Sequence, residues 1–153
     1  MIVAIFGESC TGKSTLAELL KTELNAEAFS GRDYLRLSKN EAEAKKRFAD
    51  MLKEASGPLV YVVSEKEQLA LLPGNCLRVL VTADISLIEE RFAKRMGGKL
   101  PPQVAAMLEQ KHGMFDGEPC DLRIESGVMD PKTACGRVLR AYQERFGRAE
   151  RPG

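Results

Sequence analysis

The fold of this chain is decided by one stretch near its start, Ile2-Val3-Ala4-Ile5-Phe6-Gly7-Glu8-Ser9-Cys10-Thr11-Gly12-Lys13-Ser14. Its first five residues are all apolar, which is typical of a strand that is covered on both faces. The next eight residues fit the pattern GxxxxGK(S/T), and leucines at 16, 20 and 24 then recur at helical spacing. A buried strand, a glycine-bounded turn and a helix therefore follow one another, which is the context that this pattern requires.

The turn is predicted to be a phosphate-binding P-loop. Gly7 and Gly12 allow backbone angles and a close approach of ligand that side chains would block. The N–H groups of the loop would converge on a phosphate, and the positive end of the following helix would strengthen their field. Lys13 would reach the β- and γ-phosphates of ATP, and the Ser14 hydroxyl would ligate Mg²⁺. The predicted ATP-binding residues are Gly7, Glu8, Ser9, Cys10, Thr11, Gly12, Lys13, Ser14 and Thr15.

The rest of the chain alternates between strand and helix patterns. We expect further strands at 26–29, 59–63, 77–81 and 122–124, and helices around 44–55, 65–72, 85–96, 102–108 and 138–146. This alternation predicts an α/β protein of three layers, α/β/α, with a five-stranded parallel sheet in a single domain over residues 1–153. Asp84 is expected to cap the helix that follows it. We interpret residues 148–153 as a solvated tail.

Composition narrows the possible partners. Lys and Arg number 23 and Asp and Glu 22, so the chain lacks the broad positive field that holds DNA or RNA. The longest apolar run, residues 2–6, is far shorter than the ~20 residues needed to cross a bilayer, and it has no basic leader. The four cysteines and the single histidine show no zinc-binding spacing. We expect a cytoplasmic protein with four free thiols and neither a nucleic-acid nor a membrane partner.

A P-loop alone does not distinguish kinases from GTPases or motor and transport ATPases. The chain lacks the NKxD and DxxG segments that a GTPase needs. Transport and remodelling ATPases need an acidic residue at the end of a core strand, and after strand 59–63 only Glu65 could serve. We interpret Cys10 as a spacer in the loop, because no base adjoins it to activate its thiol. Small-molecule kinases fit these features best.

The segment Ser30-Gly31-Arg32-Asp33-Tyr34-Leu35-Arg36 resembles the S-T-G-D-x-L-R segment of adenylate-kinase-like nucleoside monophosphate kinases. In that family the aspartate lies near the metal and the reacting phosphate, and the arginine holds the phosphate of the acceptor. The resemblance therefore implies these roles for Asp33 and Arg36. Taken alone, Arg36 could equally be a solvated surface residue and Asp33 a helix N-cap. The P-loop and this segment together imply the fold of that family.

A second segment, Ser86–Arg95, resembles the helix that leads into the lid of these kinases. Arg91 and Arg95 lie four residues apart on one helix face, and helical spacing gives neither an acidic partner. The resemblance implies that both stabilise the transferring phosphoryl group, with Lys13, and that a short lid lies near 96–113. We expect both arginines to be solvated without ligand; the alternative is two surface arginines that pack only through their stems.

Two other features are less informative. We interpret His112 as a helix-surface residue and not a catalytic base, because the sequence shows no partner for it. The segment Cys120–Ser126 resembles the last strand and the adenine-side loop of cytidylate-kinase-like proteins.

These observations predict an ATP-dependent, Mg²⁺-requiring kinase of a small molecule, and we favour a nucleotide or nucleoside as the acceptor. The D-G-(F/Y)-P-R acceptor segment of adenylate kinases and the paired-glycine motif of shikimate kinases are both missing. The subfamily, and with it the acceptor, therefore stays open. The alternatives are a kinase of a non-nucleotide alcohol, similar to gluconate or shikimate kinases, and a nucleotide-binding regulatory protein without turnover.

Overall fold

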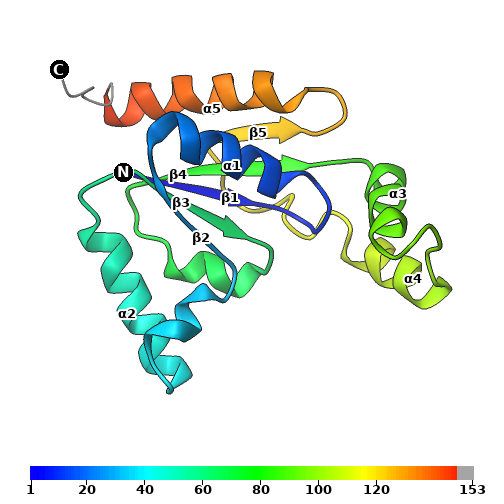
Figure 1. Ribbon diagram of the computed structural model, residues 1–153, viewed down its shortest axis with the longest axis horizontal. Helices are drawn as coiled ribbons and strands as arrows, with labels where there is room; N and C mark the ends of the chain where they lie inside the picture. Colours follow the sequence, from blue (N-terminus) through cyan, green and yellow to red (C-terminus); the bar gives the residue numbers. More distant parts are fainter. Residues whose placement is uncertain (148–153) are drawn as a thin grey trace.

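A computed structural model describes residues 1–147, and its centre is a five-stranded sheet in which every neighbouring pair is parallel (Figure 1). The strands are β1 (Ile2–Phe6), β2 (Glu27–Ser30), β3 (Leu59–Val63), β4 (Cys76–Thr82) and β5 (Leu122–Glu125). Their order across the sheet is β2-β3-β1-β4-β5. The apolar strand at the start of the chain is therefore the central strand, which explains why all five of its residues are buried. The tail predicted at 148–153 lies outside the described residues.

Side chains of β1 alternate between two hydrophobic layers, one on each face of the sheet. Val3 and Ile5 pack with the helices α1 (Lys13–Leu24) and α5 (Pro131–Phe146), which lie side by side on one face (Figure 1). Ala4 and Phe6 face the other layer, which contains α2 (Glu41–Glu54) and the short 3₁₀ helices η1 (Asp33–Leu37) and η2 (Lys66–Leu71). The predicted three-layer α/β/α architecture is confirmed.

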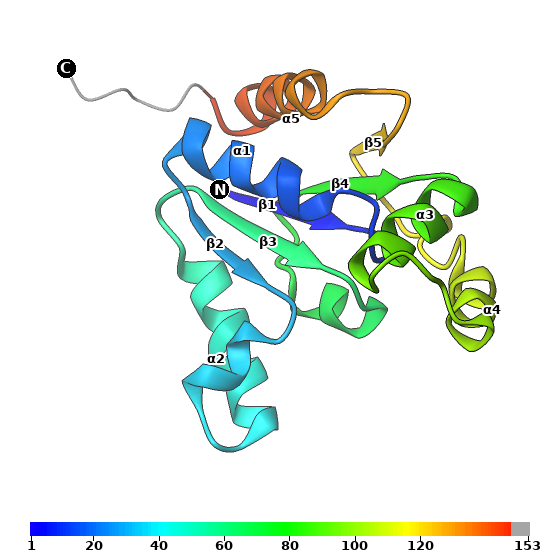
Figure 2. The same ribbon diagram turned by 45° about the vertical axis from the view of Figure 1, so that its right-hand side comes forward.

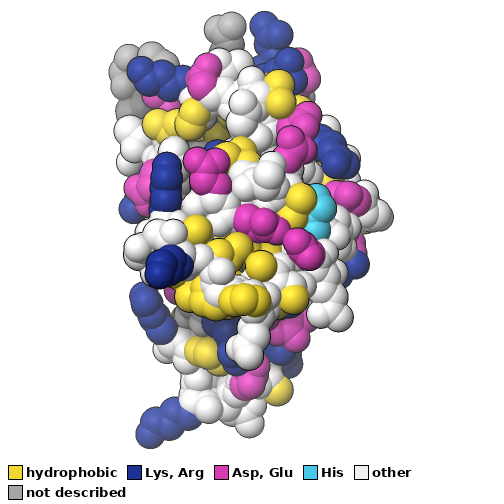
Figure 3. Space-filling model, turned by 90° about the vertical axis from the view of Figure 1, so that its right-hand side faces the viewer, with side chains coloured by type: hydrophobic (Ala, Val, Ile, Leu, Met, Phe, Trp, Pro, Cys, Tyr) yellow, Lys and Arg dark blue, Asp and Glu magenta, His cyan; other side chains and the backbone are white. Residues whose placement is uncertain are grey.

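Two further helices, α3 (Ile85–Arg95) and α4 (Pro102–Lys111), project beyond the carboxyl ends of the strands (Figure 2). We call residues 85–111 the α3–α4 arm. A small hydrophobic cluster attaches the arm to the P-loop, with Cys10 packed among Ala83, Ile88 and Leu108. Figure 3 looks onto this end of the molecule and shows hydrophobic side chains grouped on its surface. Two methionines of the arm, Met96 and Met107, are exposed.

The short helix predicted at 65–72 is the 3₁₀ helix η2, which spans Lys66–Leu71. The predicted cap at Asp84 is met in position only. Asp84 does occupy the N-cap position of α3, but its side chain accepts no hydrogen bond from the first turn. All four cysteines are free, as expected. No helix within residues 1–147 is long and apolar enough to cross a membrane.

Phe48 of α2 is the centre of an aromatic cluster that supports the segment after β2. Its ring centroid lies 4.9 Å from that of Tyr61, 5.7 Å from that of Phe29 and 6.1 Å from that of Tyr34. The Tyr61 hydroxyl in turn donates a hydrogen bond of 2.6 Å to the carbonyl of Gly31. The turn at the end of β2 is therefore stabilised by buried aromatic side chains that pack against it.

We predict that Phe48→Ala lowers the free energy of unfolding by about 3–5 kcal/mol, because it empties a site among three aromatic rings. Urea unfolding followed by circular dichroism measures this. Phe146→Ala is a suitable control, since Phe146 is only half-buried and contacts a single ring. Equal losses in the two variants would show that the cluster is not the main support of this layer.

Candidate functional site

The P-loop connects β1 to α1, and glycine is needed at two of its positions, for space at Gly7 and for the backbone angle at Gly12. A Cβ atom on Gly7 would lie 2.2 Å from the carbonyl oxygen of Val81, inside any permitted contact distance. Gly12 has a φ of 97°, in the region that favours glycine, and forms the N-cap of α1. Cys10 also has a positive φ of 64°. The predicted strand–turn–helix geometry is therefore present, and the N-terminus of α1 opens directly onto the loop.

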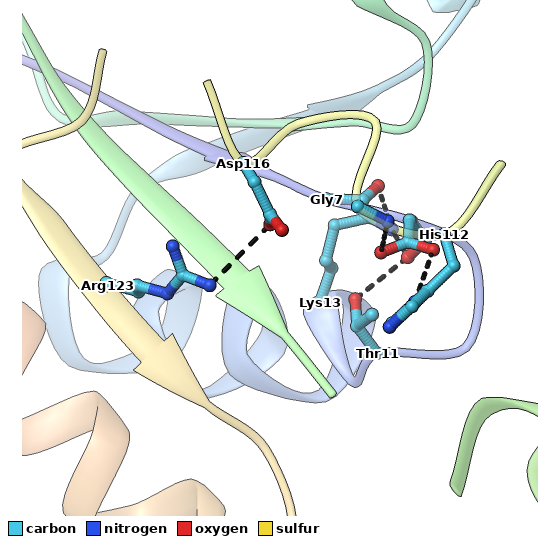
Figure 4. A network of polar contacts seen from close by, with 8 residues as sticks. Gly7, Thr11, Lys13, His112, Asp116 and Arg123 are labelled. Carbon is cyan, nitrogen blue, oxygen red and sulfur yellow. Dashed lines mark hydrogen bonds and ion pairs between the residues drawn. The ribbon is translucent and has the colours of Figure 1, made fainter. Parts of the chain in front are cut away.

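Lys13 is only 5% exposed and bends back over the loop (Figure 4). Its Nζ donates hydrogen bonds to the carbonyls of Gly7, at 2.8 Å, and Glu8, at 2.5 Å. The pKa of Lys13 is lowered from 10.5 to about 8, mainly by burial and also by Arg95, whereas Cys10 and Glu8 act in the opposite direction. Within residues 1–147 the ammonium group forms no ion pair with a carboxylate, so it is available to an anion.

A cavity of about 310 Å³ opens beside the P-loop, on the side of β3. It is lined by hydroxyl and cationic side chains, among them Lys13, Ser14, Thr15, Ser30, Ser64 and Arg95. No carboxylate is among its described lining residues. Hydroxyl donors, backbone N–H groups and two cations around a small space make a suitable site for a phosphate chain.

A larger cavity of about 630 Å³ adjoins the first. It lies between the start of α1, the helix α3 and the loop that follows β5, and its lining includes Thr15, Arg91, Arg95, Ser126 and Met129. Arg95 lines both cavities, so this residue lies where they meet. The loop after β5 is the end of the segment that resembles the adenine-side loop, and it does border this cavity.

The two arginines of α3 differ from each other. Arg95 is exposed and makes no hydrogen bond or ion pair with residues 1–147. Arg91 is half-buried, and its Nη1 donates a hydrogen bond of 3.0 Å to the carbonyl of Cys10. The expectation that both are solvated is therefore wrong for Arg91. The reason is tertiary: the attachment of the arm brings α3 against the outer side of the P-loop.

Asp33 and Arg36 lie outside the two cavities. Oδ2 of Asp33 accepts a hydrogen bond of 2.8 Å from the backbone N–H of Ser30, which closes the turn after β2. This carboxylate therefore does not cap the helix that follows it, the alternative considered above. Arg36 is in the last turn of η1 and exposed, as is Glu65 beyond the end of β3. The roles that the resemblance implies for Asp33 and Arg36 stay predictions.

Sequence reasoning missed several residues of the site. Ser30, Ser64 and Ser126 line the cavities, but isolated serines after strands carry no recognisable pattern. His112 is not without a partner: its Nδ1 lies 3.1 Å from Oε1 of Glu8 in the P-loop. These two residues are 104 positions apart, so no local signal links them.

Neither a known family model nor a curated protein sequence matches this chain. Solved structures do match. A gluconokinase from Sinorhizobium meliloti 1021 is 14% identical, with a TM-score of 0.64 over 93% of this chain and 91% of that one. A shikimate kinase from Acinetobacter baumannii, in complex with shikimate, is 13% identical, with a TM-score of 0.67 over 96% of this chain and 95% of that one.

A third structure is that of the YorR protein from Bacillus subtilis in complex with phosphorylated GDP. It is 17% identical and has a TM-score of 0.68 over 98% of this chain and all of its own. At such low identity these similarities establish the fold alone. The chain has the fold of the P-loop small-molecule kinases, as the sequence resemblance implied.

The lowered pKa of Lys13 makes the stability of the ligand-free protein depend on pH. Between pH 8 and about 10.5 the unfolded chain retains a proton that the folded protein has lost, so stability rises with pH. Lys13→Met removes this group. We predict that the variant's stability relative to the parent is greatest below pH 8 and falls by up to about 3 kcal/mol as the pH rises towards 10.5. Urea unfolding at a series of pH values tests this, and a constant difference would contradict it.

Proposed function

We propose that this protein is an ATP-dependent, Mg²⁺-requiring kinase of a small molecule. One observation carries the proposal: a buried lysine that pairs with no carboxylate of residues 1–147 lies in a P-loop beside a hydroxyl-lined cavity that an exposed arginine borders. Charge neutralisation and positioning are the main requirements of phosphoryl transfer, and these groups supply both. The fold shared with the gluconate and shikimate kinases supports the same reading.

The nucleotide would bind with its phosphates on the P-loop and its base in the larger cavity. Lys13 would exchange its bonds to the carbonyls of Gly7 and Glu8 for contacts with phosphate oxygens. Arg95, where the two cavities meet, would stabilise the charge on the transferring group. Arg91 would keep one donor on the carbonyl of Cys10 and direct others towards the phosphates. The connection near 96–113 would then act as the lid of a single kinase domain.

The residues present fit Mg²⁺. The Ser14 hydroxyl is exposed and lines the smaller cavity, where it would supply one oxygen ligand. Mg²⁺ in such sites keeps several waters and binds to substrate phosphates, which would supply the other oxygen ligands. When bound, the ion neutralises phosphate charge. Glu65 is exposed at the N-cap position of η2, and it would contribute to metal binding at most through a bound water.

The acceptor would bind beside the turn after β2, where Asp33 and Arg36 lie. An acceptor phosphate would need Arg36, whereas an alcohol acceptor would need Asp33 to take its proton. We favour a nucleotide or nucleoside because of the S-G-R-D-Y-L-R segment. A sugar acid or similar alcohol is the second candidate, and it is favoured by the similarity to a gluconokinase and a shikimate kinase. A regulatory protein that binds ATP without turnover is the third.

The decisive experiment measures ADP release from ATP and Mg²⁺ across a panel of nucleoside monophosphates, nucleosides and sugar acids. A kinase gives release that depends on one class of acceptor. Tight ATP binding with only slow, acceptor-independent hydrolysis would favour the regulatory protein. Absence of both ATP binding and turnover would contradict the proposal.

We predict that Lys13→Ala lowers turnover by about 10²–10³-fold and leaves a folded protein, because one charge-stabilising donor is lost. The same assay measures the rate, and circular dichroism checks the fold. Lys21→Ala, on the exposed side of α1, is the matched control and should retain full activity. Turnover near that of the parent protein in Lys13→Ala would show that the P-loop is not the site.

Arg95→Ala should lower kcat more than it weakens ATP binding, because its contact would strengthen as charge spreads in the transition state. The ligand-free melting temperature should hardly change, since Arg95 has no partner within residues 1–147. Steady-state kinetics and a thermal melt measure the two effects. Lys94→Ala, an exposed neighbour outside both cavities, is the control. A large loss of stability with unaltered kcat would assign Arg95 to structure.

A further inference from the structure

The carboxylate of Glu8, the second residue of the P-loop, is held by the segment that follows the α3–α4 arm. Its Oε1 lies 3.1 Å from Nδ1 of His112, and its Oε2 accepts a hydrogen bond of 3.2 Å from the backbone N–H of Gly113 (Figure 4). A carboxylate can only accept, so Nδ1 of His112 carries the hydrogen. Only 11% of the Glu8 side chain is exposed. Both of its oxygens are therefore used by two consecutive residues.

The backbone carbonyl of Glu8 also accepts two hydrogen bonds from other residues of the P-loop. One, of 2.8 Å, comes from the Thr11 hydroxyl and the other from Nζ of Lys13. A loop that presents N–H groups to a phosphate must turn its carbonyls away from the ligand. The carbonyl of Glu8 is turned towards Thr11 and Lys13, and that of Cys10 towards Arg91.

The segment that holds Glu8 is itself fixed. Phe115 is 1% exposed and packs edge-on against Phe6 of the central strand, with ring centroids 5.7 Å apart. Gly113 has a φ of 81°, which favours glycine and turns its N–H towards the P-loop. Residues 112–115 therefore give Glu8 an anchor on the core, at the place where the chain returns from the arm.

A carboxylate in a phosphate-binding loop carries an electrostatic disadvantage, because it repels the anion that the loop receives. At Glu8 this charge is directed away from the cavity and bound by two donors. Its position is therefore better explained by support of the loop than by contact with the ligand.

We infer that Glu8 and His112 are positioning residues that hold the P-loop in its phosphate-binding conformation. This inference rests on the proposed binding of ATP. The pair joins the segment that follows the arm to Glu8, whose carbonyl accepts a hydrogen bond from Lys13. In the first helix of the arm, Arg91 makes a similar link to the carbonyl of Cys10. The arm thus supports the phosphate site from both of its ends.

Four variants of the full chain test this: His112→Ala, His112→Asn, Glu8→Ala and the double alanine variant. The amide of asparagine stands where Nδ1 of histidine stood, so His112→Asn can still donate to Glu8. Asp116→Asn is the matched control, because Asp116 lies in the same segment, its side chain forms an exposed ion pair with Arg123 (Figure 4), and the substitution leaves its backbone hydrogen bond to Gly113 in place. Two quantities are measured: hydrogen exchange of the P-loop amides without ligand, and the Kd of ATP by calorimetry.

We expect His112→Ala to speed exchange in residues 7–13 and to weaken ATP binding about tenfold, the effect of losing one hydrogen bond to a charged group. Glu8→Ala also loses the bond from the Gly113 N–H, so its effects should be at least as large. His112→Asn and Asp116→Asn should resemble the parent protein. The double variant should be no worse than Glu8→Ala, because that change already removes the link to His112.

Unchanged exchange in both alanine variants would overturn the inference. So would tighter ATP binding by Glu8→Ala, since the carboxylate would then act by repulsion, or a His112→Asn variant as impaired as His112→Ala. If the parent protein binds no ATP, the proposed function fails, and the exchange measurement still decides whether Glu8 and His112 hold the loop.

Discussion

The structure depends on a close approach between the first residue of the P-loop and the neighbouring strand. Gly7 follows the central strand β1 directly, and a Cβ atom there would overlap the backbone carbonyl of Val81 in β4. This contact lets the chain leave the sheet, turn sharply and begin α1 with its N–H groups facing one point. The cavity that the loop borders, and the burial of Lys13 beside it, follow from that turn.

Parallel strands bring separate parts of the chain to this point. The carboxyl ends of β1, β2, β3 and β4 lie at the same edge of the sheet, so residues just beyond them become neighbours (Figure 2). Ser30 follows this rule at the end of β2, Ser64 at the end of β3, and the start of the arm beyond β4 brings Arg95. The hydroxyl and cationic lining of the smaller cavity is thus a product of topology, and the aromatic cluster around Phe48 supports its β2 side.

The two charged side chains of the P-loop, Lys13 and Glu8, have different partners. Among residues 1–147 the ammonium of Lys13 bonds only to carbonyls, and its pKa is lowered to about 8, mainly by burial, so an incoming phosphate would stabilise its charged form. The negative charge of Glu8 is bound by His112 and Gly113, and Glu8 lines neither of the two cavities. Opposite charges that lie close together in sequence therefore face different surroundings.

The sequence by itself determined the order of the elements, the P-loop and the three-layer fold, because these depend on hydrophobic periodicity and on glycines at fixed local spacing. It also indicated Lys13 and Ser14, whose proposed roles rest on that same short pattern. Only the tertiary structure decided that Arg91 bonds to Cys10 while Arg95 stays exposed, and that His112 pairs with Glu8. Helical spacing makes the two arginines equivalent, and the histidine is 104 residues from its partner. Such contacts arise from how the arm packs on the core, and packing between distant segments leaves no local pattern in the chain.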